Sequence, residues 1–274
     1  MKPSSFHVFP AHYTVADKLG WYGLRLLCAA VLFFLLLPIL VIIPLSFSNS
    51  SFLTYPIPGW SLRWYEELFA SDDWARATRN SFIVAPLATV LATTLGTLAA
   101  VGLARVQFFG KGFITTLLIA PMVVPIVVVG VSTYLFFARI GLSDSYTGLV
   151  LVHAALGAPF VVTTVLATLQ GFNQNLVKAS LSLGAGPLQT FFRVTLPVIA
   201  PGVISGALFA FAISFDEVVV TLFLAGPTQG TLPRQMFTGI RENISPTIAA
   251  VATLLILFTA TLMMVLEWLR GRIK

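Results

Sequence analysis

The chain has 274 residues, of which 57% are hydrophobic and only 9% are charged. A soluble domain carries about 25% charged residues, so this composition excludes an ordinary water-soluble protein and indicates an integral membrane protein. The net charge of +6 does not call for a nucleic-acid partner, because Lys and Arg gather on the cytoplasmic side of membrane proteins.

Several stretches are long and apolar enough to cross a bilayer, which takes roughly 20 residues. All of them are predicted to be α-helices, because an isolated strand cannot satisfy its backbone hydrogen bonds in lipid. The predicted spans are 26–46, 81–104, 113–137, 148–170, 198–224 and 247–268. The predicted fold class is therefore all-α and integral to the membrane, with six transmembrane helices in one domain over 26–274.

Residues 1–25 are predicted to form a cytoplasmic N-terminal tail. Within it, TVADKLGWYGLRLL is amphipathic and is predicted to be a helix on the inner surface, with Thr14 as its N-cap. Cytoplasmic termini would place most of the 16 Lys and Arg residues on the inner side. We therefore expect both termini to be cytoplasmic.

The segment between the first two spans, 47–80, contains the sequence SLRWYEELF. Its apolar residues recur at helical spacing, so it is predicted to be an amphipathic helix on the outer surface. The predicted apolar face consists of Leu62, Tyr65, Leu68 and Phe69.

Motifs of catalysis and of metal binding are missing from the sequence. It has no GxxxxGK[ST] phosphate loop, no HExxH pair, no Cys/His cluster and no GxSxG. We therefore predict no catalytic residue and no metal site. His153 lies in a predicted span, where a packed histidine bonded to a backbone carbonyl is favoured over a functional one.

The inner segment 171–197 contains LVKASLSLGAGPLQTFFRVTLP. A short helix is predicted up to Leu183, followed by a sharp turn at Gly184-Ala185-Gly186-Pro187, because glycine and proline allow and fix unusual backbone angles. The residues alone leave two interpretations open. The segment either docks on a partner at the cytoplasmic face or is a hairpin packed on its own bundle.

Part of this segment resembles the EAA loop of ABC-importer permeases, through Lys178-Ala179-Ser180, Gly184 and Val194-Thr195-Leu196-Pro197. In that family the loop forms a coupling helix that seats in a groove on the ATP-binding subunit. The sequence departs from the family where Lys178 replaces the usual Glu and Ser180 the usual Ala. The resemblance implies that the ATPase is contacted by Ala179, Leu183, Gly184 and Ala185.

A second resemblance, to the spermidine/putrescine-type permeases, covers nearly the whole chain beyond residue 25. Its motifs are Trp60-Ser-Leu-Arg-Trp-Tyr65, Asn80-Ser81, Ser214-Phe-Asp-Glu217 and Arg241 through Pro246. It implies a type I ABC-importer permease fold in the bacterial cytoplasmic (inner) membrane, with alternating access. The implied cargo is a polyamine.

The implied partners are a dimer of ATP-binding subunits, a second homologous permease and an extracytoplasmic substrate-binding protein, besides membrane lipid. No cofactor is expected in this chain, since ATP and Mg would be held by the ATPase. Within the same architecture the cargo could instead be an amino acid, an opine-like compound or an aminophosphonate. A different class, a membrane scaffold or enzyme without an ATPase, is the remaining alternative.

Asp216 and Glu217 lie in the predicted fifth span. An ionised carboxylate at the centre of a spanning helix costs on the order of 3 kcal/mol, so the pair needs compensation. Neighbours on a helix point about 100° apart, so both cannot face one spot. The pair either offers charge to a cationic cargo or locks a neighbouring helix, and we expect Asp216 and Glu217 to line the substrate path.

Overall fold

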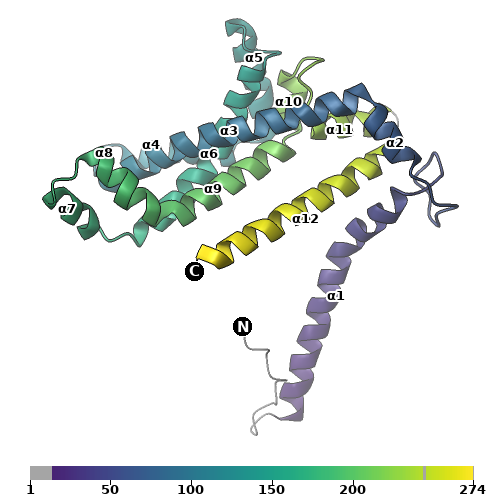
Figure 1. Ribbon diagram of the computed structural model, residues 1–274, viewed down its shortest axis with the longest axis horizontal. Coiled ribbons are helices and arrows are strands. Elements are labelled where there is room, and N and C mark those ends of the chain that lie inside the picture. Colours follow the sequence, from purple (N-terminus) through teal and green to yellow (C-terminus); the bar gives the residue numbers. More distant parts are fainter. Residues whose placement is uncertain (1–13, 243–244, 274) are drawn as a thin grey trace. The chain divides into compact units, whose positions relative to one another are not determined.

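The computed structural model describes residues 14–242 and 245–273, and the described chain is helical apart from its turns and loops (Figure 1). In chain order the helices are α1 (Val15–Leu45), α2 (Arg63–Ala70), α3 (Asp72–Arg105), α4 (Lys111–Ile119), the 3-10 turn η1 (Ala120–Met122), α5 (Ile126–Ile140), α6 (Tyr146–Gln170), α7 (Asn175–Ser182), α8 (Pro187–Thr190), the π-helical turn η2 (Phe191–Thr195), α9 (Leu196–Asp216), α10 (Val219–Leu224), α11 (Leu232–Glu242) and α12 (Thr247–Ile273). The predicted all-α class is confirmed.

The number of spans is less simple than predicted. Within the described residues, four helices are long and apolar enough to cross a membrane: Val15–Leu45, Asp72–Arg105, Tyr146–Gln170 and Pro187–Asp216. The bent pair Lys111–Met122 and Ile126–Ile140 forms a fifth if it counts as one span, and Thr247–Thr261 is a shorter apolar helix. A count of six therefore stays a prediction.

The span predicted over 113–137 is sharply bent. The chain breaks after Met122 and resumes at Ile126 with a bend of 100° between the two parts. Pro125 lies at the break, immediately before α5. A proline cannot donate a helical hydrogen bond and disfavours helical geometry in the residue before it.

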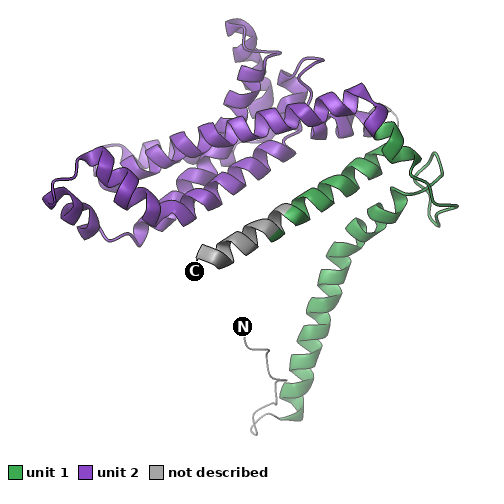
Figure 2. Cartoon of the chain, viewed as in Figure 1, with its two compact units in different colours: residues 1–68, 243–274 green, residues 69–242 purple. Residues whose placement is uncertain are grey.

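The chain divides into two compact units, coloured in Figure 2. Unit 1 comprises 1–68 and 243–274, and unit 2 comprises 69–242. In unit 1, α1 begins at the predicted cap, where the Thr14 hydroxyl accepts from the Asp17 backbone and the Asp17 side chain accepts from Thr14. The helix then runs on to Leu45 without a break near residue 25, so the predicted separate helix is instead the first turns of α1.

The amphipathic helix predicted in 47–80 exists as α2, but its buried face differs from the prediction. Trp64 and Leu68 are buried, whereas Leu62 and Phe69 are exposed. The Trp64 indole Nε1 donates to the Ser48 carbonyl at 2.7 Å, which fixes this face. The prediction used only the spacing of apolar residues, so it did not include Trp64, whose indole N–H makes this hydrogen bond.

The centre of unit 2 is built from α3, α6 and α9, which pack along one another (Figure 1). Lipid is as apolar as a side chain, so helices in a membrane are held by close packing at small residues. A Cβ added to Gly157 would lie 3.0 Å from the Cβ of Ala210, and one added to Gly206 would lie 2.8 Å from the Cα of Val161. These contacts make the three helices a tight core.

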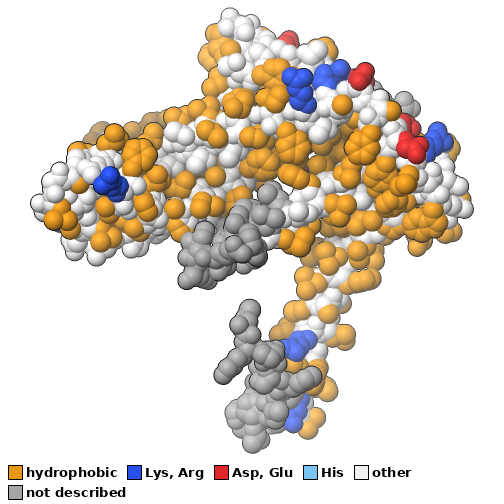
Figure 3. Space-filling model, in the orientation of Figure 1, with side chains coloured by type: hydrophobic (Ala, Val, Ile, Leu, Met, Phe, Trp, Pro, Cys, Tyr) orange, Lys and Arg blue, Asp and Glu red, His pale blue; other side chains and the backbone are white. Residues whose placement is uncertain are grey.

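Hydrophobic side chains cover much of the surface drawn in Figure 3. The apolar helix α1, which has 31 residues, has no buried residue. In water such a surface would drive aggregation, whereas lipid or a neighbouring apolar helix accommodates it.

Candidate functional site

The two acidic residues lie at a break between helices, not within a helix. Asp216 is the last residue of α9, and Glu217 has φ −73° and ψ 113°, an extended conformation. The chain becomes helical again only at Val219, where α10 begins. The predicted continuous helix over 198–224 is therefore wrong, and the two side chains are not separated by the 100° that neighbours on a helix have. We call residues 216–218 the acidic break.

The two carboxylates at the break have different surroundings. Glu217 is half-buried, and its Oε1 accepts from the Val220 backbone N–H at 2.8 Å. The Glu217 carbonyl also accepts from the Thr221 hydroxyl at 3.2 Å. Glu217 thus caps α10, because a side-chain acceptor satisfies a backbone donor of the first helical turn.

Asp216, in contrast, is exposed. In the part of the chain that the structure describes, no hydrogen bond or ion pair is made by its side chain. A carboxylate at a predicted membrane depth with no internal partner needs a charge or donor from elsewhere. Of the two predicted path residues, Asp216 is therefore the one available to a ligand.

His153 on α6 holds the two sides of the break together. Its side chain is 1% exposed. Nδ1 lies 2.9 Å from the Ser214 hydroxyl and 3.2 Å from the Ser214 carbonyl, while Nε2 lies 3.2 Å from the Thr221 hydroxyl. The interpretation of His153 as a packed, carbonyl-bonded histidine is confirmed, and its partners place it directly behind the acidic break.

Aromatic rings surround the residue before Asp216. Phe215 stacks on Phe211 with ring centroids 5.4 Å apart and meets Phe82 of α3 edge-on at 5.5 Å. The only signal of this cluster in the sequence is the spacing of four between Phe211 and Phe215, which places them on one helical face. Aromatic rings beside a carboxylate suit organic cations, which are attracted to both.

The predicted coupling loop forms a helical hairpin. It consists of α7, a turn, α8 and η2, residues 175–195, which we call the coupling hairpin. The Ser180 and Thr190 hydroxyls lie 3.0 Å apart and join its two arms. At its base, the Arg105 guanidinium donates to the buried Thr195 hydroxyl at 3.1 Å. The hairpin is therefore fixed to the end of α3.

The turn of the coupling hairpin depends on Gly184. Its φ is +86°, in the left-handed region that glycine adopts freely, and a Cβ there would meet nothing within 4 Å. Space is not the constraint, so the backbone angle alone requires glycine. Pro187 was predicted to belong to the turn and instead begins α8, where a proline at the first helical turn is favourable.

Three of the four predicted ATPase contacts meet at one cleft. Its volume is about 370 Å³, and its lining includes Ser180, Leu183, Gly184, Ala185, Gln189 and Arg193. Ala179 is exposed on α7 and is not part of this lining. Leu183 projects into the surroundings and is 88% exposed.

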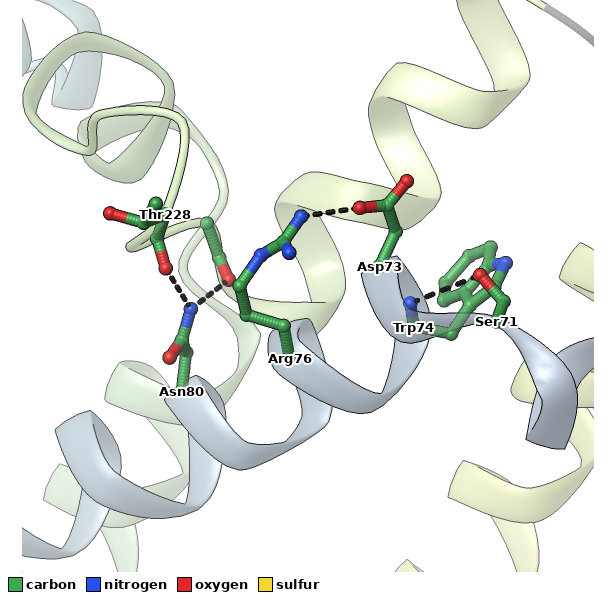
Figure 4. A network of polar contacts seen from close by, with 7 residues as sticks. Ser71, Asp73, Trp74, Arg76, Asn80 and Thr228 are labelled. Atoms are coloured by element: carbon green, nitrogen blue, oxygen red, sulfur yellow. Dashed lines mark hydrogen bonds and ion pairs between the residues drawn. The ribbon is translucent and has the colours of Figure 1, made fainter.

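A polar network lies at the other end of α3, where Figure 4 shows Asn80 bonded to the loop of Thr228. The buried Asn80 donates through Nδ2 to the carbonyls of Thr228 and Gly230 at 2.9 and 2.8 Å. Its Oδ1 accepts from the Tyr146 hydroxyl at 2.8 Å. Arg76 turns away from this group and pairs with Asp73. Asn80 thus holds the loop that follows α10.

The motif Arg241 through Pro246 is only partly described. Arg241 is exposed at the end of α11. Asn243 and the residue after it lie outside the described residues, as does the side chain of Glu242.

A separate cavity of about 820 Å³ follows α4 and the bend after it. Its polar lining includes Gln107, Lys111, Thr115 and Thr116. Neither Asp216 nor Glu217 lines this cavity. The carboxylates and this volume are therefore distinct features of unit 2.

Comparison with known proteins places the chain among transport proteins. The family model of the binding-protein-dependent transport system inner membrane component matches residues 92–274. The putrescine transport system permease protein PotI of Escherichia coli K12 is 35% identical over 230 residues, covering 81% of this chain and 82% of PotI. The spermidine/putrescine transport system permease protein PotC of Haemophilus influenzae KW20 is 33% identical, covering 84% of this chain and 89% of PotC.

Other similar proteins are named for different cargoes. The molybdate/tungstate transport system permease protein WtpB of Pyrococcus furiosus is 32% identical over 198 residues, covering 71% of this chain and 77% of WtpB. A crystal structure of a bacterial ABC transporter involved in the import of the acidic polysaccharide alginate has a chain that matches with a TM-score of 0.76 at 14% identity. That match covers 96% of this chain and 99% of the other. It shows the fold and nothing about the cargo.

Proposed function

This chain is a member of the family of binding-protein-dependent transport system inner membrane components, and we propose that the cargo of its importer is a polyamine. The chain is thus a permease subunit of an ABC importer and a transport protein of the inner membrane. It is not an enzyme, since ATP hydrolysis belongs to separate ATPase subunits. The observation that supports a polyamine as the cargo is the 33–35% identity to polyamine permeases over more than four fifths of the chain.

The acidic break supports a cationic cargo. A polyamine carries several ammonium groups separated by methylene chains. The unpartnered Asp216 carboxylate can accept a hydrogen bond from an ammonium. The aromatic faces of Phe211 and Phe215 next to it can attract the same charge and cover the methylenes.

Within this proposal Asp216 and Glu217 have different roles. Asp216 meets the cargo, while Glu217 caps α10 and keeps the break open through the Val220 bond. Glu217 therefore belongs to the path as a residue that shapes it. The Asp216 contact supports binding of a cation and disfavours an anion by repulsion.

At the other end of α9, the coupling hairpin is proposed to seat in the ATP-binding subunit through Ala179, Leu183, Gly184 and Ala185. Movement of the ATPase dimer, which holds ATP and Mg, would reach the bundle through the Arg105–Thr195 bond and the continuous helix Pro187–Asp216. A second permease completes the path and a substrate-binding protein delivers the cargo from outside. Both termini are proposed to be cytoplasmic.

A second candidate keeps the architecture and changes the cargo to another small solute. The specific observation in its favour is the 32% identity to a molybdate/tungstate permease, since the family accommodates more than one cargo class. An anionic cargo would be repelled by Asp216, so among these alternatives a cationic or zwitterionic solute fits better.

The test is uptake of labelled putrescine and spermidine into cells lacking this gene, with and without its restored expression. Unlabelled amino acids and unlabelled polyamines are added as competitors. The proposal expects restoration to raise uptake and only polyamines to compete. Unchanged polyamine uptake, with the complex still assembled, would contradict the cargo assignment and leave the family membership intact.

A further inference from the structure

The coupling hairpin and its surroundings carry only positive charge. The sequence 171–197 contains Lys178 and Arg193 and no Asp or Glu. The neighbouring segment 105–111 adds Arg105 and Lys111, again without an acidic residue. Figure 3 shows a basic side chain and no acidic one over α7 and α8 on the face drawn. This end of unit 2 therefore cannot neutralise its own charge.

The two cations of the hairpin are held apart in a fixed arrangement. Lys178 lies on α7 and Arg193 on η2, the two arms that the Ser180–Thr190 bond joins. Both are exposed. In the part of the chain that the structure describes, neither side chain makes an ion pair. Leu183 projects from the turn between the two arms.

We propose that the groove receiving the coupling hairpin carries carboxylates that pair with Lys178 and Arg193, around an apolar pocket that takes Leu183. This inference rests on the proposed function, which supplies an ATP-binding subunit as the partner. Charge complementarity selects the partner, because an exposed pair of cations is attracted by an acidic groove and repelled by a basic one. An ATP-binding subunit with a basic groove would be rejected by the same charges.

Anionic lipid headgroups are the competing occupant. They would attract the same cations at a cytoplasmic surface. The arrangement favours a protein, because the cleft beside Arg193 is about 370 Å³ and is shaped by a glycine turn and a projecting leucine. Charge alone is enough to attract a lipid surface, whereas binding in a protein groove also requires a matching shape such as this cleft and the projecting leucine.

The experiment uses the complete complex extracted from cells through a tagged permease. A water-soluble carbodiimide joins a lysine amine to a carboxylate that it contacts, and mass spectrometry identifies the joined peptides. We expect a cross-link between Lys178 and an Asp or Glu of the ATP-binding subunit. Lys178→Arg should remove the cross-link and keep the ATP-binding subunit bound, since it preserves the charge without a coupling amine.

A second experiment reverses the charge of Lys178. Lys178→Glu should lower the amount of ATP-binding subunit retained per permease by about tenfold at low ionic strength. Lys111→Glu makes the same charge change at the same end of unit 2 but outside the hairpin, and should lower retention less.

Three results would decide against the proposal. Equal retention by Lys178→Glu and the unchanged chain at every ionic strength overturns it. A fall in the amount of permease in the membrane, with retention per permease unchanged, overturns it in favour of lipid headgroups. If the unchanged chain retains no ATP-binding subunit, the proposed function itself fails, which is distinguishable from an effect of Lys178 alone.

Discussion

The coupling hairpin and the acidic break lie at opposite ends of α9 and are stabilised in opposite ways. The two arms of the hairpin are joined by the Ser180–Thr190 contact, its base is fixed by Arg105, and Leu183 at its turn is left exposed. The break is held from behind by the buried His153 of α6, which lies 61 residues from Ser214 in the sequence. The exposed turn of the hairpin is the part that we propose a partner covers, whereas the break is shaped by residues of this chain.

This difference separates the expected effects of substitutions. Changes in the hairpin should alter how fast the importer turns over, because they affect transmission from the ATPase. Changes at the break should alter how tightly cargo is held. A substitution that altered both equally would erase the distinction.

Gly184→Ala should have the largest effect. At φ +86° an alanine is strained by roughly 1–2 kcal/mol, and relief of that strain would reshape the turn. We expect the maximal rate of uptake to fall by about tenfold or more. Gly186→Ala is the matched control, because its φ is −69° and a Cβ there meets nothing within 4 Å. Equal loss in both variants would contradict the role of the backbone angle.

Asp216→Asn should weaken cargo binding next. A hydrogen bond to a charged group contributes roughly 1.5–3 kcal/mol, which corresponds to about tenfold or more in affinity. The measurement is the polyamine concentration at half-maximal uptake, with complex assembly checked in parallel. Glu217→Gln should also lower transport but less, because its amide oxygen can still accept from the Val220 N–H. Full uptake by both variants would remove these residues from the path.

His153→Ala should lower stability by roughly 1–3 kcal/mol, because the Ser214 and Thr221 hydroxyls lose a buried partner. Thermal unfolding in detergent measures this. His153→Gln, which keeps a polar group in the same place, should lose less. An unchanged unfolding temperature in His153→Ala would show that the break is held by other contacts.

Arg76→Ala should have the smallest effect, within about 1 kcal/mol, because its pair with Asp73 is exposed and screened by solvent. Asn80→Ala at the same end of α3 should cost more, roughly 1–3 kcal/mol, since it leaves two loop carbonyls without their donor. The same unfolding assay compares the two. An Arg76 effect as large as that of Asn80 would reverse the ranking of surface and buried contacts.

The sequence was sufficient where structure follows from local chemistry. The cap at Thr14, the helical class and the glycine turn at Gly184 all depend on nearby residues, and each is observed. The break after Asp216 was not predicted, because an apolar run is typical of one spanning helix whether or not it is interrupted. The bend at Pro125 has a local cause in the proline itself, but its angle of 100° does not follow from the sequence. Periodicity carries no signal for a break that is fixed by long-range bonds to His153.

The distances along the chain explain the remaining omissions. Asn80 meets Thr228 across 148 residues, and Phe82 meets Phe215 only because α3 and α9 pack together. A single sequence contains these residues but does not indicate which of them are in contact. The different roles of Asp216 and Glu217 likewise do not follow from the sequence, because they depend on which carboxylate caps α10.

We expect the acidic break to bind the cargo and the coupling hairpin to link its transport to ATP. This expectation is tested most directly by labelled putrescine uptake into proteoliposomes that contain the complete importer. Uptake is measured over a range of putrescine concentrations for Asp216→Asn and Gly184→Ala. We expect Asp216→Asn to raise the half-saturating concentration and keep the maximal rate, and Gly184→Ala to lower the maximal rate and keep the half-saturating concentration. A change in the same parameter in both variants would contradict it.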